Sequence, residues 1–256
     1  MRLFRRCIWL VVAALLSLFV VSPLAAQGTV AETVRTVLAV GRVSSVVDTR
    51  MHFKLLRISL PASASTTYRG AHSTIYQLSG TLAMETGNEK RILQEGEGTF
   101  IAAGTDAILQ ASGSAPAIFL HFLLVSSTDL DKPAESPPAV VTELHRMAIP
   151  TAALKPGPYE FSMTRITRGP GKAAPPHMRS GAALYYVLAD GVLSIWPTGP
   201  DGIITGESRD EMRPAGAIQE EPYGFVHTWS SLPNSRVILL VGNINLEGTA
   251  DIIVVK

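Results

Sequence analysis

The stretch GAIQEEPYGFVH, residues 216–227, decides the fold of this chain. Its spacing is Gly216, five residues, Pro222, one residue, Gly224, two residues and His227. Pro222 cannot donate to a β-ladder and therefore suits the start or the edge of a strand. Gly224 suits a tight turn between strands, which needs a positive φ. The stretch thus predicts a tight turn that leads into a new strand at His227.

A second ordered motif lies upstream. Gly171 is followed by five residues and then by His177, and further on Tyr185-Tyr186-Val187-Leu188 leads to Gly191. We expect Gly191, like Gly224, to hold the positive φ of a tight turn between strands. Short runs of this kind, rich in β-branched and aromatic residues and separated by Gly, Pro, Asp and Ser, predict an all-β sandwich or barrel.

Together the two motifs resemble those of the cupin superfamily, in particular its type-2 members, whose fold is a double-stranded β-helix or jelly-roll barrel. The second motif matches at every position up to His227, and its last position, often Asn in the family, is Ser231. The resemblance implies that the chain forms antiparallel barrels of this kind, with the motif residues facing the barrel interior.

The resemblance breaks at the metal site. Cupins typically bind a divalent metal through two His and one Glu of the first motif and one His of the second. His177 and His227 fill two of these positions, but Arg179 stands in place of the second His, and Ala183 or Leu184 in place of the Glu. A divalent transition metal in the C-terminal barrel is the implied cofactor, held by His177 and His227. Two imidazoles alone make a weak site, because catalytic centres usually have three protein ligands.

The two halves of the chain resemble each other, which predicts a tandem pair of barrels, a bicupin with a degenerate metal site. The corresponding segments are 53–58 and 161–166, 76–80 and 186–191, 118–120 and 238–240, with Gly96 and Gly104 matching Gly216 and Gly224. An insertion near residues 197–207 explains the growing offset between the copies. In the first half Thr67, Arg69, Ser73 and Ala107 occupy the metal-ligand positions, so no ligand is expected there.

The predicted organisation is a signal peptide at residues 1–26, a degenerate cupin-like barrel at 27–130, a Pro-rich linker at 131–139 and a second barrel at 140–256. Three arginines precede a short apolar run and then small residues that suit cleavage after Ala26. We therefore expect a bacterial periplasmic or secreted protein. The only cysteine, Cys7, lies in the leader, so the mature chain is expected to have no disulfide.

The charge of the chain is nearly balanced, with 22 Lys and Arg against 21 Asp and Glu. No basic stripe or charge block is present, which argues against nucleic acid and anionic membrane surfaces as partners. After signal cleavage no membrane contact is expected. The family resemblance implies a homodimer.

Arg179 is an unusual side chain to face a barrel interior, because a buried unpaired charge is costly. An internal partner such as Glu160 or Glu220, or an outward turn into solvent, would account for it. Alternatively, the guanidinium binds a ligand carboxylate through two parallel hydrogen bonds. Arg69 occupies the corresponding place in the first half.

The residues expected to bind a small-molecule ligand are His177, Arg179, Tyr185, Phe225, His227 and Trp229. The sequence leaves three functions open. The first is an exported binding protein whose second barrel holds a small anionic organic ligand, such as a carboxylate. The second is a metal-dependent enzyme of the dioxygenase or isomerase type that uses His177 and His227 with a third ligand from Glu160, Glu220, Glu221 or Tyr185. The third is a structural or interaction protein with two degenerate barrels. The missing Glu favours binding over catalysis.

Overall fold

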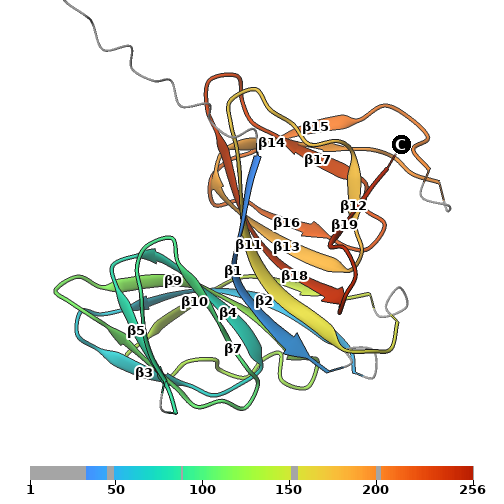
Figure 1. Ribbon diagram of the computed structural model, residues 1–256. Helices are drawn as coiled ribbons and strands as arrows, with labels where there is room; N and C mark the ends of the chain where they lie inside the picture. The colour runs from blue at the N-terminus through green and yellow to red at the C-terminus, as the bar shows by residue number, and fades with distance from the viewer. Residues whose placement is uncertain (1–32, 45–48, 88, 151–154, 200–202, 256) are drawn as a thin grey trace, which may run out of the picture. The chain divides into compact units, whose positions relative to one another are not determined.

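The alternation of apolar and polar residues produces strands throughout the chain (Figure 1). The computed structural model describes residues 33–44, 49–87, 89–150, 155–199 and 203–255. In these ranges it contains nineteen strands and no helix. The described part of the chain therefore has no helix with the length and apolar character needed to cross a lipid bilayer. The predicted signal peptide lies outside the described residues.

The first barrel is built from two antiparallel sheets with the strand orders β10-β2-β9-β4-β7 and β3-β8-β5-β6. Its strands are β2 (Met51–Leu60), β3 (Ser65–Tyr68), β4 (His72–Ser79), β5 (Leu82–Thr86), β6 (Glu89–Leu93), β7 (Gly98–Ile101), β8 (Ala107–Ala111), β9 (Ala117–Ser126) and β10 (Val140–Ala148).

The second barrel repeats this plan, with the strand orders β1-β11-β18-β13-β16 and β15-β14-β17-β12-β19. Its strands are β1 (Thr33–Val43), β11 (Tyr159–Arg168), β12 (His177–Arg179), β13 (Ala182–Ala189), β14 (Gly191–Ile195), β15 (Arg209–Arg213), β16 (Ile218–Glu221), β17 (His227–Ser230), β18 (Val237–Leu246) and β19 (Ile252–Val254). The prediction of two tandem double-stranded β-helix barrels is confirmed.

The duplication is visible in the strand register. Tyr76 pairs with Leu120 in the first barrel, and Tyr186 pairs with Leu240 in the second. The longer segment between β14 and β15, residues 196–208, replaces the tight turn at Gly87 that joins β5 to β6, as the expected insertion requires.

The two barrels exchange their first strands. β1 precedes the first barrel in sequence, yet it pairs with β11 of the second barrel. β10 precedes β11, yet it pairs with β2 of the first barrel. In Figure 1 β1, in blue, runs beside β11, in yellow. The sequence-based boundaries at residues 130 and 140 do not express this exchange, and residues 31–256 form one compact unit.

Each barrel has an apolar interior, and a further apolar cluster draws side chains from both copies. In this shared cluster Phe53 contacts its counterpart Phe161, with ring centroids 5.8 Å apart. Gly242 in β18 lies against Phe122 of β9, so closely that a Cβ on Gly242 would fall 2.6 Å from the Phe122 ring. Close packing between the copies therefore depends on the absence of a side chain at Gly242.

Two glycines of the motifs behave differently. Gly224 has a φ of 83°, as predicted for the turn before His227. The prediction of a positive φ at Gly191 is wrong, because this residue is extended backbone at the start of β14. A Cβ there would lie 2.5 Å from the Val237 side chain, so close approach between strands, not turn geometry, requires this glycine.

A segment after the long strand of each copy folds back over the open end of its barrel. In the first barrel this first strap, residues 127–138, includes all but the last residue of the linker predicted at 131–139. Its Glu135 bridges to Tyr68 of β3 and pairs with His121 in the interior, where both side chains are fully buried. In the second barrel the second strap, residues 247–255, contains β19, which pairs with β12. Each strap thus carries a carboxylate to its barrel, Glu135 in one and Asp251 in the other.

Candidate functional site

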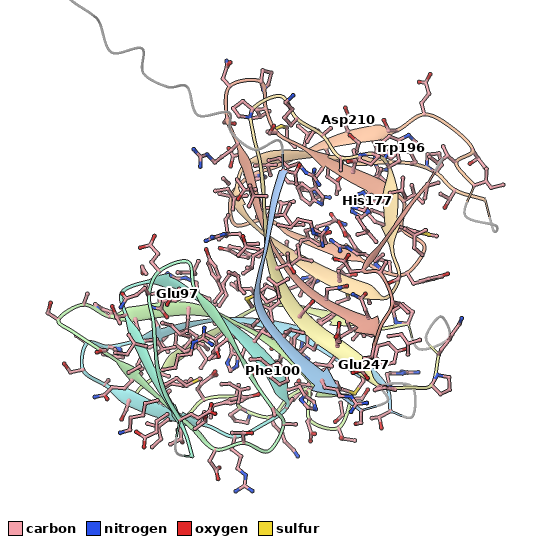
Figure 2. All side chains as sticks on the ribbon, in the orientation of Figure 1. Glu97, Phe100, His177, Trp196, Asp210 and Glu247 are labelled. Atoms are coloured by element: carbon pink, nitrogen blue, oxygen red, sulfur yellow. The ribbon has the colours of Figure 1, made fainter. Side chains whose placement is uncertain are left out.

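Two histidines face each other across strands inside the second barrel. His177 of β12 and His227 of β17 are direct cross-strand partners, and their ring centroids are 4.6 Å apart. His177 Nδ1 lies 2.9 Å from the carbonyl of Pro175, and His227 Nδ1 lies 3.1 Å from the carbonyl of Phe225. When Nδ1–H donates to a carbonyl, the lone pair of a neutral imidazole is on Nε2. The His177 ring is therefore held with Nε2 as its free acceptor, whereas Nε2 of His227 faces the carboxylate of Glu221 at 2.8 Å. Figure 2 labels His177 among the side chains of this barrel.

Arg179 points inward from the same short strand and is almost completely buried, with 1% of its surface exposed. Its Nη2 donates to the Tyr185 hydroxyl, its Nη1 donates to Asp251 at 3.2 Å, and its Nε donates to Glu221 at 3.4 Å. The guanidinium also lies over the Tyr185 ring. The acidic partners satisfy the requirement that a buried charge be paired.

Glu221 of β16 is the acid at the centre of the site and is fully buried. One of its oxygens accepts the indole N–H of Trp229 at 3.0 Å and lies 2.8 Å from His227 Nε2, while the other faces Arg179. Glu221 is the cross-strand partner of Ala183, a position where the cupin motif has Glu. The carboxylate of the site therefore comes from the neighbouring strand.

The acids predicted to pair with Arg179, Glu160 and Glu220, do not do so. Neighbouring residues of a strand face opposite sides, so Glu220 points out of the barrel when Glu221 points in. Glu220 instead contacts His145 at 2.6 Å on the outside. Glu160 lies exposed on β11. From the sequence, Glu221 was considered only as a possible third metal ligand, because the strand pairing that brings it to Arg179 cannot be derived from sequence alone.

The remaining predicted ligand-binding residues surround this core. The Tyr185 and Trp229 rings stack at 5.8 Å, and both side chains are buried. Phe225 stacks on His227 with centroids 5.3 Å apart and is partly exposed. The structure thus brings the predicted residues into one cluster, but most of them are already engaged with each other.

The charges of the site are set by burial and by neighbouring groups. Burial lowers the pKa of His177 to about 4, and His227 and Arg179 add to this effect. Burial by itself would raise the pKa of Glu221, but the charges of His227 and Arg179 outweigh it and hold the pKa low. Burial raises the pKa of Tyr185. At neutral pH the site therefore contains a neutral His177, an ionised Glu221 and a neutral Tyr185.

Sequence reasoning missed two asparagines of β18. Asn243 is a cross-strand partner of Ala183, and both polar atoms of its buried side chain have no hydrogen-bond partner in the described structure. Asn245 accepts a bond from Ser180 at 3.2 Å. His227 Nε2 also has no partner of good geometry, despite its distance to Glu221. The signal was available, since two polar residues interrupt the run Val237–Leu246 at alternate positions.

Among the described residues of the first barrel, Tyr68, Ile101 and Ala107 occupy the positions of His177, Glu221 and His227. Tyr68 pairs with Ala107 as His177 pairs with His227, so Tyr68 is the counterpart of His177. The sequence-based correspondence of Thr67 with His177 and of Arg69 with Arg179 is therefore shifted by one residue. Arg69 is largely exposed and forms an ion pair with Asp106 at 3.5 Å, because its loop leaves the barrel after β3.

The chain matches no family model and no curated protein. Solved structures are similar. Oxalate decarboxylase from Bacillus subtilis at pH 4.6 has a TM-score of 0.53 and 12% identity, covering 84% of this chain and 73% of that chain. A variant of the same enzyme, in which a tryptophan is replaced by phenylalanine, has a TM-score of 0.55 at 12% identity, with coverage of 84% and 74%. The formate complex of Lactobacillus farciminis oxalate decarboxylase has a TM-score of 0.52 at 10% identity, with coverage of 84% and 83%. At such identities the similarity shows the fold alone, a tandem cupin fold.

The fold implies a metal ion, and the second barrel does not fit one. Both oxygens of Glu221 are engaged, one by the indole N–H of Trp229 and the other by Arg179. The Arg179 cation stands where the family places a histidine ligand, and a second cation beside it would be repelled. Among the residues with described positions, no group of three or more His, Cys, Asp or Glu is arranged to hold a metal ion.

Proposed function

We propose that this chain is an exported binding protein of the cupin fold whose second barrel holds a small hydrophilic carboxylate. The observation that carries the proposal is the set of unsatisfied polar atoms in that barrel, on Asn243 and His227. A buried polar group without a partner costs about 1–3 kcal/mol, and a polar ligand would remove this cost.

Asp251 indicates where the carboxylate of a ligand would bind. Its side chain is 32% exposed, and it lies in the second strap, outside the strands of the barrel wall. It contacts the outer edge of Arg179 and also pairs with Arg35 at the surface. Glu221 already neutralises the charge of Arg179 from the barrel interior. A ligand carboxylate can therefore bind Arg179 only if it displaces Asp251. Arg179 therefore holds a carboxylate of the chain itself in the place proposed for the ligand.

The structural neighbours support the same ligand class. Their names describe a decarboxylase of oxalate, and one was solved as a formate complex. We therefore choose oxalate, formate and acetate as probes, with the neutral acetamide as the uncharged control.

Asp251→Asn is the informative variant, because it removes the competing carboxylate and keeps the shape of the side chain. Calorimetric titration is expected to show oxalate or acetate binding about tenfold more tightly to Asp251→Asn than to the unmodified protein. Glu247→Gln is the matched control, since Glu247 lies in the same strap but pairs with Arg42. It should leave binding unchanged.

Asn243→Leu tests the deeper part of the site. Leu is the residue that the first copy has at the corresponding position, Leu123, so the substitution suits the fold. We expect it to weaken carboxylate binding by removing the amide donor. Absence of carboxylate binding to both the unmodified protein and Asp251→Asn at millimolar concentration would overturn the proposal.

The alternative, a metal enzyme that uses His177 and His227, is tested by the metal content of protein purified without chelators or a His-tag. We expect no stoichiometric transition metal. One equivalent of metal, lost in the His177→Ala, His227→Ala double variant, would support the enzyme instead.

Export and assembly are part of the proposal. N-terminal sequencing of protein from the periplasmic fraction or the medium should begin at Gln27. Light scattering of the mature protein tests the homodimer that the family resemblance implies.

A further inference from the structure

The first barrel contains the larger of two cavities that lie at corresponding places in the two copies. Its volume is about 440 Å³, within the size range of small-molecule sites. The walls on the barrel side include Lys54, Tyr68, Leu123 and Val125, and the opposite wall is formed by the first strap, including Ala134. The cavity therefore lies between the barrel and a segment that folds over it.

The corresponding cavity of the second barrel measures about 290 Å³ and is lined by Tyr159 and Tyr223. By register Ile101 corresponds to Glu221, which makes Ala103 the counterpart of Tyr223. Both cavities are thus a property of the duplicated fold. The small residue Ala103 lines the larger cavity, where the second copy has a tyrosine.

Lys54 is a buried cation in the wall of this cavity. Its side chain is 8% exposed, and its ammonium donates to the carbonyl of Leu130 at 2.8 Å. Lys54 also forms an ion pair with Glu143 at 3.6 Å, and the two oxygens of Glu143 accept from Arg146 at 2.5 and 2.9 Å. An ammonium has three N–H groups, so Lys54 keeps N–H donors for a further acceptor.

The cavity has an apolar part, with Leu123 and Val125 in the barrel and Pro133 and Ala134 in the strap. Its other charged lining residues are engaged in ion pairs, Lys132 with Asp129 and Arg69 with Asp106. A buried cation with spare donors, set in an apolar wall, suits an anionic head on an apolar body. We propose that this cavity binds a small monocarboxylate with an aliphatic or aromatic body, whose carboxylate accepts from Lys54. The ligand class differs from the hydrophilic carboxylate of the second barrel.

The first strap closes this site over its ligand. Glu135 pairs with buried His121, and Thr66 donates to the carbonyl of Ser136 at 2.6 Å. These contacts hold the strap in place next to its apolar residues Pro133 and Ala134. The apolar body of the ligand packs beneath those residues.

Hexanoate is the probe, with hexanol and hexylamine as neutral and cationic ligands of the same body. Calorimetric titration is expected to detect hexanoate binding and no comparable binding of the other two. Across butanoate, hexanoate and octanoate the affinity should rise roughly fourfold per added methylene, because each buried CH₂ contributes a similar amount.

Two variants test the assignment. Lys54→Met keeps the length of the side chain and should weaken hexanoate binding at least tenfold, whereas Lys90→Met, at an exposed lysine of β6 in the same copy, should not. Ala103→Tyr places the second copy's residue in the cavity and should block binding without removing any charge. Asn243→Leu, in the other barrel, should leave hexanoate binding unchanged.

Failure of the unmodified protein to bind hexanoate, equal binding by Lys54→Met, or equal binding of hexanol would each overturn the proposal. Loss of hexanoate binding in Asn243→Leu would move the ligand to the second barrel and overturn it as well. Circular dichroism of each variant establishes that it is folded.

Discussion

Glu221 contacts three buried groups in the second barrel. It accepts from Trp229, lies against His227 and balances Arg179, all without contact with solvent. In a buried ion pair the cost of removing one partner exceeds the value of the pair, because the other charge is left without compensation. The barrel interior should therefore depend strongly on this carboxylate.

Glu221→Gln is expected to lower the free energy of unfolding by about 3–5 kcal/mol, measured by urea denaturation. Glu220→Gln, one residue away on the exposed face, should change it by less than about 1 kcal/mol. The double variant Glu221→Gln, Arg179→Met should cost less than the sum of its single changes, since neither charge is then left alone. Additive costs would contradict the pairing.

His177 predicts a pH dependence of stability. Its pKa is about 4 in the folded protein and about 6.5 in the unfolded chain. Between these values the unfolded chain binds a proton that the folded protein does not, so the free energy of unfolding rises with pH. The contribution, about 3 kcal/mol at most, is complete above pH 6.5 and is lost as the pH falls to about 4.

The measurement is urea denaturation at several pH values between 4 and 7. His177→Gln should remove this part of the slope, and His145→Gln, at a half-exposed histidine, should keep it. An unchanged slope in His177→Gln would show that other groups cause the dependence.

At the residue scale the sequence predicted which motif side chains meet in the second barrel. Alternation along a strand was enough to place His227 and Trp229 on one face. The partners of Arg179 could not be predicted, since Glu221 and Asp251 approach from a neighbouring strand and from a strap. Those contacts depend on register, which a single strand does not encode.

At the scale of elements, strands were predictable from their apolar alternation and from the glycines and prolines between them. The strand exchange was not, because β1 and β10 carry similar patterns and either could pair at the edge of either barrel. The packing of β9 against β18 is one place where the barrels approach closely. Gly242 beside Phe122 is one such position, and Gly41 beside Phe100 is another.

Gly242→Ala is expected to cost about 1–3 kcal/mol of unfolding free energy, since its Cβ would overlap the Phe122 ring. In a Phe122→Leu background the same substitution should cost less, because the smaller side chain leaves room. Thermal or urea denaturation of the four proteins measures the coupling. An equal cost in both backgrounds would contradict the contact.

At the scale of the whole molecule, exchanged strands tie the stability of one barrel to the other. Each barrel takes an edge strand from a segment that belongs in sequence to its neighbour, and an apolar cluster is shared between them. Neither copy can complete its sheet alone. The protein should therefore unfold as one unit.

Urea unfolding followed by tryptophan fluorescence reports the second barrel, where Trp196 and Trp229 lie, whereas far-ultraviolet circular dichroism reports both. We expect coincident midpoints by the two probes. Thr142→Pro, which disturbs the pairing of β10 with β2, should lower both midpoints together. Two separate transitions would show that the barrels unfold independently.

The contact between Gly242 and Phe122 has a consequence for the history of the chain. These residues stand at corresponding positions of the two copies, so the copies meet as the halves of a dimer do, with a phenylalanine on one side and a gap on the other. A true homodimer would set Phe against Phe, which is too crowded, or Gly against Gly, which leaves a void. In a symmetric homodimer both subunits must have the same residue at each interface position. Joining the copies removes that constraint, so the two halves can differ: one carries the buried Arg179–Glu221 cluster, and the other the larger cavity beneath its strap.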